Sequence, residues 1–414
     1  MTMLTILILC FIIGNWALET WATKQNLGAL GQDIPAEFQH AVDATKYVRS
    51  QAYTRENARL SLVSDGVQVF AILLCLFLGV FDVFNNWARS LVSGDILQGL
   101  AFFAIVGLAS TLLSLPFSIY RTFRIEETYG FNRTTPKLFI TDRIKGLLLA
   151  VAVGAPLAAA VLWFFQTFST FGWLIAWGFT IAFMFAVQYV APIWIMPLFN
   201  KFTPLGEGEL RTAIEDFAHA NGFHISGIYT IDGSKRSNKA NAFFTGFGKQ
   251  KRIALFDTLV DSMSTKEIVG VLAHEIGHCK LNHIKRMFLT SIVTTGITFF
   301  VLSFVLQYQP LYEVFHVQHM NIAVGMVLFG FLYTPLSLLL SVLASSQSRK
   351  YEFEADAFAA RTTGAPEELS RALVKLSVHS LANLTPHPAY VFFHYSHPPV
   401  VARLQALEKF RTTS

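Results

Sequence analysis

The chain has 414 residues, of which 53% are hydrophobic and only 14% are charged, and its mean hydropathy is +0.46. Soluble proteins carry about 25% charged residues, so this composition excludes an ordinary soluble domain and favours a membrane protein. The small net charge of +5, dispersed along the chain, argues against a nucleic-acid-binding protein, and three cysteines are too few for a disulfide framework or a cysteine-based zinc site.

Seven apolar runs are candidates for transmembrane helices, because a helix of about 20 apolar residues crosses a bilayer. In chain order they are residues 3–18, 66–84, 96–119, 146–168, 173–198, 287–307 and 322–343. The first run is short, as in a signal peptide. However, no Lys or Arg precedes it, and this favours a first span over a signal peptide.

The distribution of Lys and Arg predicts how these spans are oriented. The tail before the first span has 0 basic residues, the six connections have 5, 1, 6, 0, 12 and 0, and the final tail has 8. Connections rich in Lys and Arg stay in the cytoplasm. The alternation therefore predicts an amino terminus outside, a carboxy terminus in the cytoplasm and an odd number of spans.

Between the fifth and sixth spans, two β-prone runs flank a turn rich in Gly and Lys within residues 241–256, which predicts a hairpin. The edge of such a hairpin can hold an extended peptide as an added strand. Asn241 at its start could hydrogen-bond such a peptide, and Ala242 and Phe243 follow on the same strand. A hairpin with a purely structural role fits the pattern equally well.

The segment His274-Glu275-Ile276-Gly277-His278 has the spacing of a metal site. Two histidines four residues apart lie on one face of a helix, so both imidazoles can reach one zinc ion. Glu275 lies beside them and can act as a general base towards a water on the metal. The pattern arises by chance in roughly one such chain in a hundred, so the prediction depends on a third ligand.

After the seventh span the chain returns to the side of this motif and carries Glu352, Glu354 and Asp356. A catalytic zinc site usually has three protein ligands. Glu352 and Asp356 share a helix face, whereas Glu354 points about 200° away from Glu352. We therefore predict Glu352 as the third ligand and Asp356 as the acceptor for the outer N–H of a ligand histidine. Without the histidine motif, a solvated amphipathic helix would be the better interpretation.

The remaining histidines are weaker candidates. His283 lies nine residues beyond His274, on the opposite face of a continuous helix, and is not predicted as a ligand. His394 and His397 belong to the rigid polar segment H-Y-S-H-P-P at 394–399. A histidine near zinc can stabilise a tetrahedral oxyanion, although spacing alone favours a plain surface role for His397.

Together these elements predict a mainly α polytopic membrane protein with seven transmembrane helices and a cytoplasmic zinc metalloprotease domain that contains a small β-hairpin or sheet. We expect four regions: residues 1–199 with spans one to five and their cytoplasmic connections, 200–286 with the hairpin and the histidine helix, 287–344 with spans six and seven, and 345–414 with the third ligand and a substrate-contact segment.

Several longer motifs occur in one order along the chain. They are E-T-Y-G-F-N at 127–132, M-P-L-F-N-K-F at 196–202, S-K-R-S at 234–237, N-A-F-F at 241–244, the histidine motif, the segment 352–356, and H-Y-S-H-P-P at 394–399 with Arg403. On these motifs the chain resembles, over most of its length, the type I CAAX prenyl proteases, which are integral-membrane zinc metalloproteases of the gluzincin kind.

The resemblance implies that the seven helices surround a large water-filled intramembrane chamber and that each chain binds one zinc ion. The site residues it implies are the ligands His274, His278 and Glu352, the base Glu275, and the substrate or transition-state contacts Asn241, His397 and Arg403. The implied partners are the lipid bilayer and a peptide substrate. That substrate is a prenylated Cys-a-a-X carboxy terminus, from which the last three residues are removed; some family members make a second cut upstream.

The carboxy-terminal residues 411–414, R-T-T-S, show no dilysine retrieval signal, and the chain is compact beside many eukaryotic members. We therefore expect a bacterial cytoplasmic membrane, or the endoplasmic reticulum membrane if the source is eukaryotic. Bacteria need not make prenylated Cys-a-a-X proteins, which leaves the natural substrate open.

Two alternative functions are weighed against this one. A membrane-protein quality-control metalloprotease would use the same chemistry on unprenylated peptides, but such proteases have fewer spans. A non-enzymatic seven-helix transporter or receptor usually places ionisable side chains within its spans. Here the ionisable cluster lies at the cytoplasmic mouth of the spans, which favours an enzyme.

Overall fold

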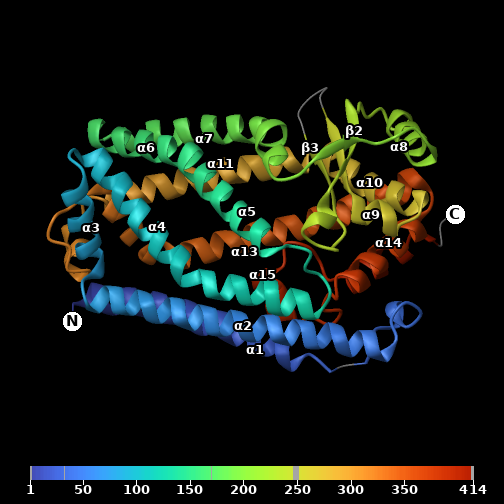
Figure 1. The fold of residues 1–414 in the computed structure, drawn as a ribbon, viewed down its shortest axis with the longest axis horizontal. Coiled ribbons are helices and arrows are strands. Elements are labelled where there is room, and N and C mark those ends of the chain that lie inside the picture. The colour runs from blue at the N-terminus through green and yellow to red at the C-terminus, as the bar shows by residue number, and fades with distance from the viewer. Residues whose placement is uncertain (1, 32, 169, 246–250, 412–414) are drawn as a thin grey trace.

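The structure, a computed structural model, describes residues 2–31, 33–168, 170–245 and 251–411 (Figure 1). Most of these residues are helical, and four short strands form one sheet. The helices are α1 (Met3–Gly28), α2 (Ala44–Phe77), α3 (Val80–Leu91), α4 (Asp95–Tyr120), α5 (Pro136–Leu149), α6 (Ala155–Thr167), α7 (Gly172–Val190), α8 (Glu209–Ala220), α9 (Asp257–Ser262), α10 (Thr265–Lys280), α11 (His283–Val305), α12 (Gln309–Val314), α13 (Ile322–Thr363), α14 (Pro366–His379), α15 (Pro388–His394) and α16 (Val400–Glu408). The strands are β1 (Phe202–Pro204), β2 (Gly227–Ile231), β3 (Ala242–Thr245) and β4 (Arg252–Phe256).

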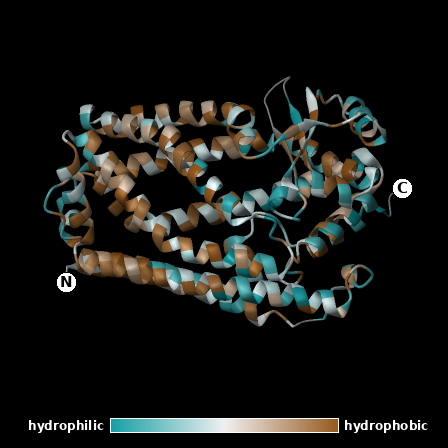
Figure 2. Cartoon of the chain, viewed as in Figure 1, coloured by the Kyte–Doolittle hydropathy of each residue, from teal (hydrophilic) through white to brown (hydrophobic). Residues whose placement is uncertain are grey.

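Within the described ranges, seven helical stretches are long and apolar enough to cross a membrane. They are Met3–Gly28, Ala44–Phe77, Asp95–Glu126, Pro136–Thr167, Gly172–Leu198, His283–Val305 and Ile322–Thr363. Figure 2 shows hydrophobic residues along these long helices and hydrophilic residues gathered at the end of the molecule that holds the sheet and α14. The prediction of a mainly α polytopic membrane protein with seven spans is confirmed.

The second predicted span, residues 66–84, has the wrong bounds. Helix α2 starts much earlier, at Ala44, and ends at Phe77. Gly79 then adopts a left-handed conformation with φ 64°, which glycine tolerates and which turns the chain into the separate helix α3. The apolar run continues across this break because α3 packs Phe81 into the same core as α1 and α4.

Helix α13 joins the membrane part to the site. Its 42 residues make it roughly 63 Å long, about twice the thickness of the hydrocarbon core of a bilayer. The helix passes through the end of the predicted seventh span, residues 322–343, without a break, and its last turns carry Glu352 and Asp356. The predicted third ligand therefore stands on the rigid extension of a membrane helix.

The sheet has the strand order β1-β2-β4-β3, with β2 parallel to β4 and the other neighbours antiparallel. The antiparallel pair of β3 and β4 confirms the predicted hairpin, whose turn at 246–250 lies outside the described residues. The strands β1 and β2 were not predicted. Ile253 and Leu255 of β4 pack against Ile268 and Leu272 of α10, so the sheet covers the histidine helix and leaves β3 at an edge (Figure 1).

Candidate active site

Helix α10 carries the histidine motif and begins with a capping box. The Ser264 side chain accepts a hydrogen bond from the Glu267 N–H at 3.4 Å, and the Glu267 carboxylate accepts one from the Ser264 N–H at 2.8 Å. Glu267 is buried and also pairs with Lys375 of α14 at 2.7 Å. These contacts fix where α10 starts and how it lies against α14.

Gly277 lets α10 and α13 approach closely. A Cβ at this position would lie 3.2 Å from both the Ala355 Cα and a ring carbon of Phe358, tighter than ordinary packing allows. On α13, the small side chains of Ala355 and Ala359 are buried. The close approach brings Glu352, on the preceding turn of α13, up to the two histidines.

His274, His278 and Glu352 meet in one cluster, and one candidate ligand atom from each lies within 4.8 Å of the others. The two Nε2 atoms are 3.1 Å apart. The Glu352 carboxylate places Oε1 3.3 Å from Nε2 of His278 and Oε2 3.5 Å from Nε2 of His274. The structure thus brings together the three residues that the sequence proposed as ligands.

The outer nitrogen of His274 faces Asp356, with 2.8 Å between Nδ1 and Oδ1. An ionised carboxylate only accepts hydrogen bonds, so we assign the ring proton of His274 to Nδ1. In the neutral imidazole, Nε2 is then a bare lone pair that points into the cluster. Asp356 is 2% exposed, so water does not compete for this bond.

A chain of three side chains fixes the other histidine in the same way. His283 Nε2 donates to the Glu354 carboxylate at 2.9 Å, which leaves its Nδ1 as an acceptor. That atom lies 3.0 Å from Nδ1 of His278, which must therefore carry the proton. The Nε2 of His278 becomes the second bare lone pair facing Glu352.

This chain was not predicted, because the spacing was interpreted as one continuous helix from His274 to His283. Helix α10 ends at Lys280, and Asn282 takes the left-handed conformation with φ 59°, which asparagine tolerates better than most residues. The turn folds His283 back towards the motif. His283 is fully buried and stacks on Tyr351, with ring centroids 4.2 Å apart and planes 7° from parallel.

The cluster has the properties of a cation site. Two bare nitrogens 3.1 Å apart beside a carboxylate repel one another unless a positive charge lies between them. Oε2 of Glu352 is buried and makes no hydrogen bond within the described residues, although Nη1 of Arg403 is 3.2 Å away. Tetrahedral zinc with ligands at about 2.0–2.1 Å separates ligand atoms by about 3.3 Å, so the spacing and the nitrogen and oxygen donors fit zinc.

The protonation of the site follows the same contacts. Burial alone would lower the pKa of His274, but its hydrogen bonds to Asp356 and Glu352 outweigh burial and raise the pKa to about 9. Without a metal, His274 therefore carries a second proton on Nε2 at neutral pH, and this nitrogen becomes a free lone pair only when a cation displaces that proton. Burial also raises the pKa of the Glu275 carboxyl, which suits a group that takes up and releases a proton.

Comparison with known proteins identifies the family. Residues 24–201 match the family described as "CAAX prenyl protease N-terminal, five membrane helices", and residues 204–411 match Peptidase family M48. The chain belongs to the CAAX prenyl protease family of M48 metallopeptidases. It is therefore a multi-pass membrane metalloendopeptidase, as the motifs predicted.

Relatives of this protease cover nearly its whole length. The "CAAX prenyl protease 1 homolog" of Oryza sativa subsp. japonica is 37% identical over 410 residues, which are 97% of this chain and 96% of the relative. The "CAAX prenyl protease 1" of Saccharomyces cerevisiae is 36% identical, over 96% of this chain and 94% of the relative. The crystal structure of S. mikatae Ste24p matches with a TM-score of 0.94 and 35% identity, over 99% of this chain and 100% of that one.

Arg403 of this family member is buried beside the candidate ligands. Its guanidinium donates to both oxygens of Asp356, at 2.8 Å from Nε and 2.7 Å from Nη2, and it is only 9% exposed. Nη1 adds the contact with Glu352 at 3.2 Å. These contacts make Arg403 a support of the candidate ligands, and its contact with a substrate stays a prediction.

His397 lies at the open side of the protease site. Its Nε2 is 3.3 Å from Oε1 of Glu352, while the side chain is 63% exposed. Ser396 contacts the other ring nitrogen at 2.9 Å, and Arg349 donates to the Tyr395 carbonyl at 2.6 Å, which ties this segment to α13. An accessible imidazole beside the ligands is well placed to meet a substrate.

The edge strand β3 begins with the predicted substrate residues Ala242 and Phe243, and Asn241 directly precedes it. β3 lies at the same end of the protease as α10 (Figure 1). Asn241 is exposed, and its Oδ1 accepts from the Ala242 N–H at 2.9 Å. Phe243 packs edge-on against Phe256 of β4. Their contact with a peptide stays a prediction.

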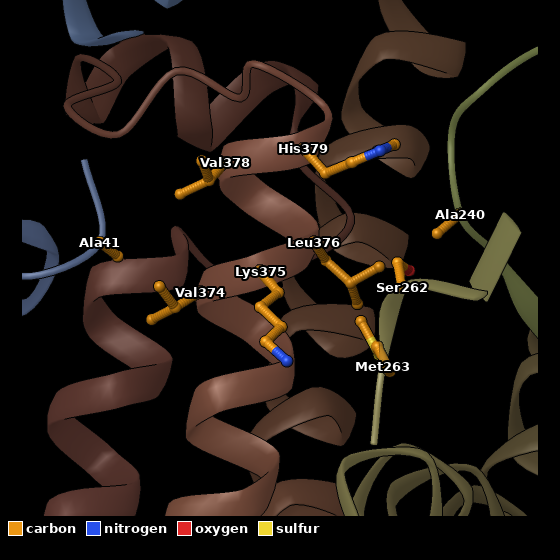
Figure 3. A pocket seen from close by; sticks show the side chains of 9 residues that line it. All are labelled: Ala41, Ala240, Ser262, Met263, Val374, Lys375, Leu376, Val378 and His379. Carbon is orange, nitrogen blue, oxygen red and sulfur yellow. The ribbon is translucent and has the colours of Figure 1, made fainter. Parts of the chain in front are cut away.

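A shallow cavity of about 230 Å³ lies elsewhere on this part of the protease (Figure 3). Side chains of α14, both apolar and basic, form most of its wall, and Ala240 and Met263 close the other side. None of the predicted site residues lines it. We therefore place the chemistry in the buried histidine and glutamate cluster and not in this cavity.

The His278–His283–Glu354 chain leads to a first prediction. In a His283→Phe variant the ring can still stack on Tyr351, but no acceptor remains for the His278 N–H. We expect the affinity for zinc to fall about 10–100-fold, as for other partners of metal ligands. Competition with a fluorescent chelator measures this affinity. Lys350→Gln is the control, because it removes an exposed cation 3.8 Å from the Glu354 carboxylate, and it should leave the zinc affinity unchanged. Unchanged affinity in His283→Phe would contradict the role of this chain.

Proposed function

We propose that this protein is a zinc-dependent membrane endopeptidase that processes prenylated CAAX carboxy termini by removing their last three residues. The observation that carries the proposal is the pair of bare Nε2 atoms on His274 and His278, fixed by buried partners and facing Glu352, with Glu275 beside them. The relatives that match over nearly the whole chain are named as CAAX prenyl proteases, which supports this choice of substrate.

The side chains have separate tasks in this proposal. His274, His278 and Glu352 would hold zinc, which supplies a Lewis acid that polarises the peptide carbonyl and acidifies a water. Glu275 takes the proton from the attacking water and passes it to the leaving amide nitrogen. His397, exposed beside Glu352, donates to the oxygen that becomes negative as the tetrahedral intermediate forms.

Asp356 and Arg403 act through the ligands. Asp356 orients His274 by accepting its Nδ1–H, and Arg403 holds both Asp356 and Glu352 in place. The positive charge of Arg403 also keeps these two buried carboxylates ionised next to each other. Without this cation, two negative charges would lie close together in a buried setting, and the ligand carboxylate would bind metal less well.

The backbone of β3 offers a place for the peptide. Phe256 N–H donates to the Asn241 carbonyl at 3.0 Å, so these two residues form a hydrogen-bonded pair across β3 and β4. Because such pairs alternate, the backbone groups of Ala242 and Phe244 turn away from β4 towards the free edge. An extended peptide can pair with them as an added strand. In the structure the Ala242 N–H donates to the side-chain oxygen of Asn241. A substrate carbonyl would replace that oxygen as the acceptor.

The orientation in the membrane follows from charge. Basic residues are concentrated on the side of the chain that carries the site, which we therefore place in the cytoplasm with the amino terminus outside. A bacterial cytoplasmic membrane and an endoplasmic reticulum membrane both face the cytosol on this side. CAAX carboxy termini are made in the cytosol, so either membrane would present them to the site. In this proposal the prenyl chain would enter the intramembrane chamber that the family resemblance implies.

Two peptides that differ only in prenylation test the substrate. We expect the purified, zinc-loaded protein to cleave a farnesylated CAAX peptide with a kcat/KM about 100-fold or more above its unprenylated twin. Burying only four of the farnesyl carbons would contribute about 3 kcal/mol, enough for this ratio. Mass spectrometry of the products locates the cut. Equal cleavage of both peptides would instead support a quality-control protease, and no cleavage of either would overturn the proposal.

A further inference from the structure

The position of the edge strand β3 must be fixed by contacts outside its free edge. In the described residues its only strand neighbour is β4, and under the proposed function its other side is reserved for the substrate. β3 has only four residues and is hydrogen-bonded on one side, so contacts at its end help to set its position. The segment that enters β3, from Arg236 to Ala240, makes such contacts with the membrane helices.

Arg236 makes the first contact. Its Nε and Nη2 donate to the two oxygens of Asp142 in α5, at 2.8 and 2.9 Å, and its Nη1 donates to Oδ1 of Asn200 at 2.7 Å. Both charged side chains are only about a quarter exposed, at 24% and 22%. Two parallel hydrogen bonds of this kind fix orientation as well as distance. Arg236 is thereby fixed to the first turns of the fourth membrane stretch.

Lys239 makes the second contact. Its Nζ lies 3.0 Å from the Glu126 carboxylate, at the end of the third membrane stretch, and 2.9 Å from the hydroxyl of Tyr53 in α2. Tyr53 also donates to Glu126, which closes a three-membered polar cluster. The ammonium sits over the Phe131 ring, 4.5 Å from its centroid, a cation–π contact. Lys239 lies two residues before Asn241.

The backbone joins the same two segments. The Arg133 N–H donates to the Arg236 carbonyl at 3.0 Å, and the Asn238 N–H donates to the Phe131 carbonyl at 3.2 Å. Asn132 and Ser237 pair as an isolated antiparallel bridge. The segment before β3 is thus held along its length by the connection between the third and fourth membrane stretches.

We propose that Arg236 with Asp142, and Lys239 with Glu126 and Tyr53, form an anchor that positions the substrate edge of β3 relative to the metal centre. None of these five residues contacts the three candidate ligands through the interactions that define the anchor. They are positioning residues that act through Asn241 and Ala242. The inference rests on the proposed function, because it concerns where the peptide backbone lies when Glu275 and the metal act on it.

Three variants of the full-length, zinc-loaded protein test the anchor. Arg236→Lys keeps the charge but loses the two parallel hydrogen bonds, Asp142→Asn removes the charge, and Asp142→Arg combined with Arg236→Asp exchanges the partners. We expect the two single variants to lose about 10–100-fold in kcat/KM on the CAAX peptide, mainly through KM, because small displacements of a substrate are costly. Their zinc content and their affinity for a small chelating hydroxamate should not change. The exchanged pair should recover most of the loss.

Hydrogen exchange gives a readout that does not need activity. The β3 amides should exchange faster in Asp142→Asn than in the wild type, while those of α10 stay protected. The control is Glu215→Gln, which also removes a carboxylate that pairs with an arginine. Glu215 pairs with Arg211 at 2.9 Å on the exposed face of α8. This variant should change neither the kinetics nor the exchange of the β3 amides.

The anchor would be overturned if both single variants kept wild-type kinetics and wild-type exchange of β3. It would also be overturned if they lost hydroxamate binding as much as kcat/KM, because that would show general damage to the metal centre. If the wild type itself cleaves no peptide, the proposed function fails. The exchange of β3 then still decides the anchor: faster exchange in Asp142→Asn supports it, and unchanged exchange overturns it.

Discussion

Replacing Glu275 with glutamine is expected to lower kcat on a farnesylated CAAX peptide by about 10²–10⁴-fold while the protein keeps its zinc. Glutamine has the same shape but cannot take a proton from the attacking water. Glu275 is not one of the three side chains that converge on the cation position, so metal binding should not depend on it. Burial already disfavours its charged form, and the neutral amide should therefore not destabilise the fold.

Single-turnover cleavage, measured together with zinc content by elemental analysis, checks this prediction. The exposed Glu215→Gln serves as the matched control, because it makes the same chemical change away from the site. Near-normal cleavage by Glu275→Gln would show that another group is the base. Loss of zinc from this variant would show that Glu275 also holds the metal centre together.

Sequence patterns predicted the parts of the site that depend on regular helix geometry. His274 and His278 share a face because α10 is unbroken between them, and Glu352 and Asp356 share a face because α13 continues for several turns beyond the membrane span. The seven spans followed from apolar length alone. Each of these predictions needed only the period of the helix or the thickness of the bilayer.

The parts that were missed depend on where a helix stops. A single left-handed residue, Asn282, separates α10 from α11 and brings His283 under the motif, and Gly79 divides the second apolar run in a similar way. Backbone conformations of single residues leave little trace in hydrophobic periodicity. An asparagine within the apparent continuation of the motif helix, followed by a histidine, was the one available signal.

The contacts of Arg403 with the candidate ligands were not predicted, for a different reason. Its motif placed it near the site, but the direction of its side chain depends on tertiary packing of α16 against α13. The neighbouring carboxylates of Glu352 and Asp356 are both buried, and two buried negative charges are stable only beside a positive charge. Arg403 supplies that charge. Counting charges around the predicted ligands would have suggested this role before any substrate contact.

The third ligand can be tested against its nearest competitor. Glu352→Gln is expected to weaken zinc binding by more than about 100-fold, beyond the effect of losing a partner of a ligand, because the variant removes an anionic donor itself. His397 is the alternative third ligand, since its Nε2 lies 3.3 Å from the same carboxylate. We expect His397→Gln to lower kcat with little loss of zinc, because this side chain is mostly exposed and lies outside the group of three.

Zinc affinity by chelator competition, measured on both variants together with kcat, separates the two assignments. Glu408→Gln, at an exposed ion pair in α16, controls for the change of charge. If Glu352→Gln binds zinc as tightly as the wild type and His397→Gln does not, the carboxylate is a partner of the site and the ligand set is three histidines. The position of Glu352 argues for the opposite result, because its carboxylate is buried between the two histidines and its Oε2, although paired with Arg403, makes no hydrogen bond within the described residues.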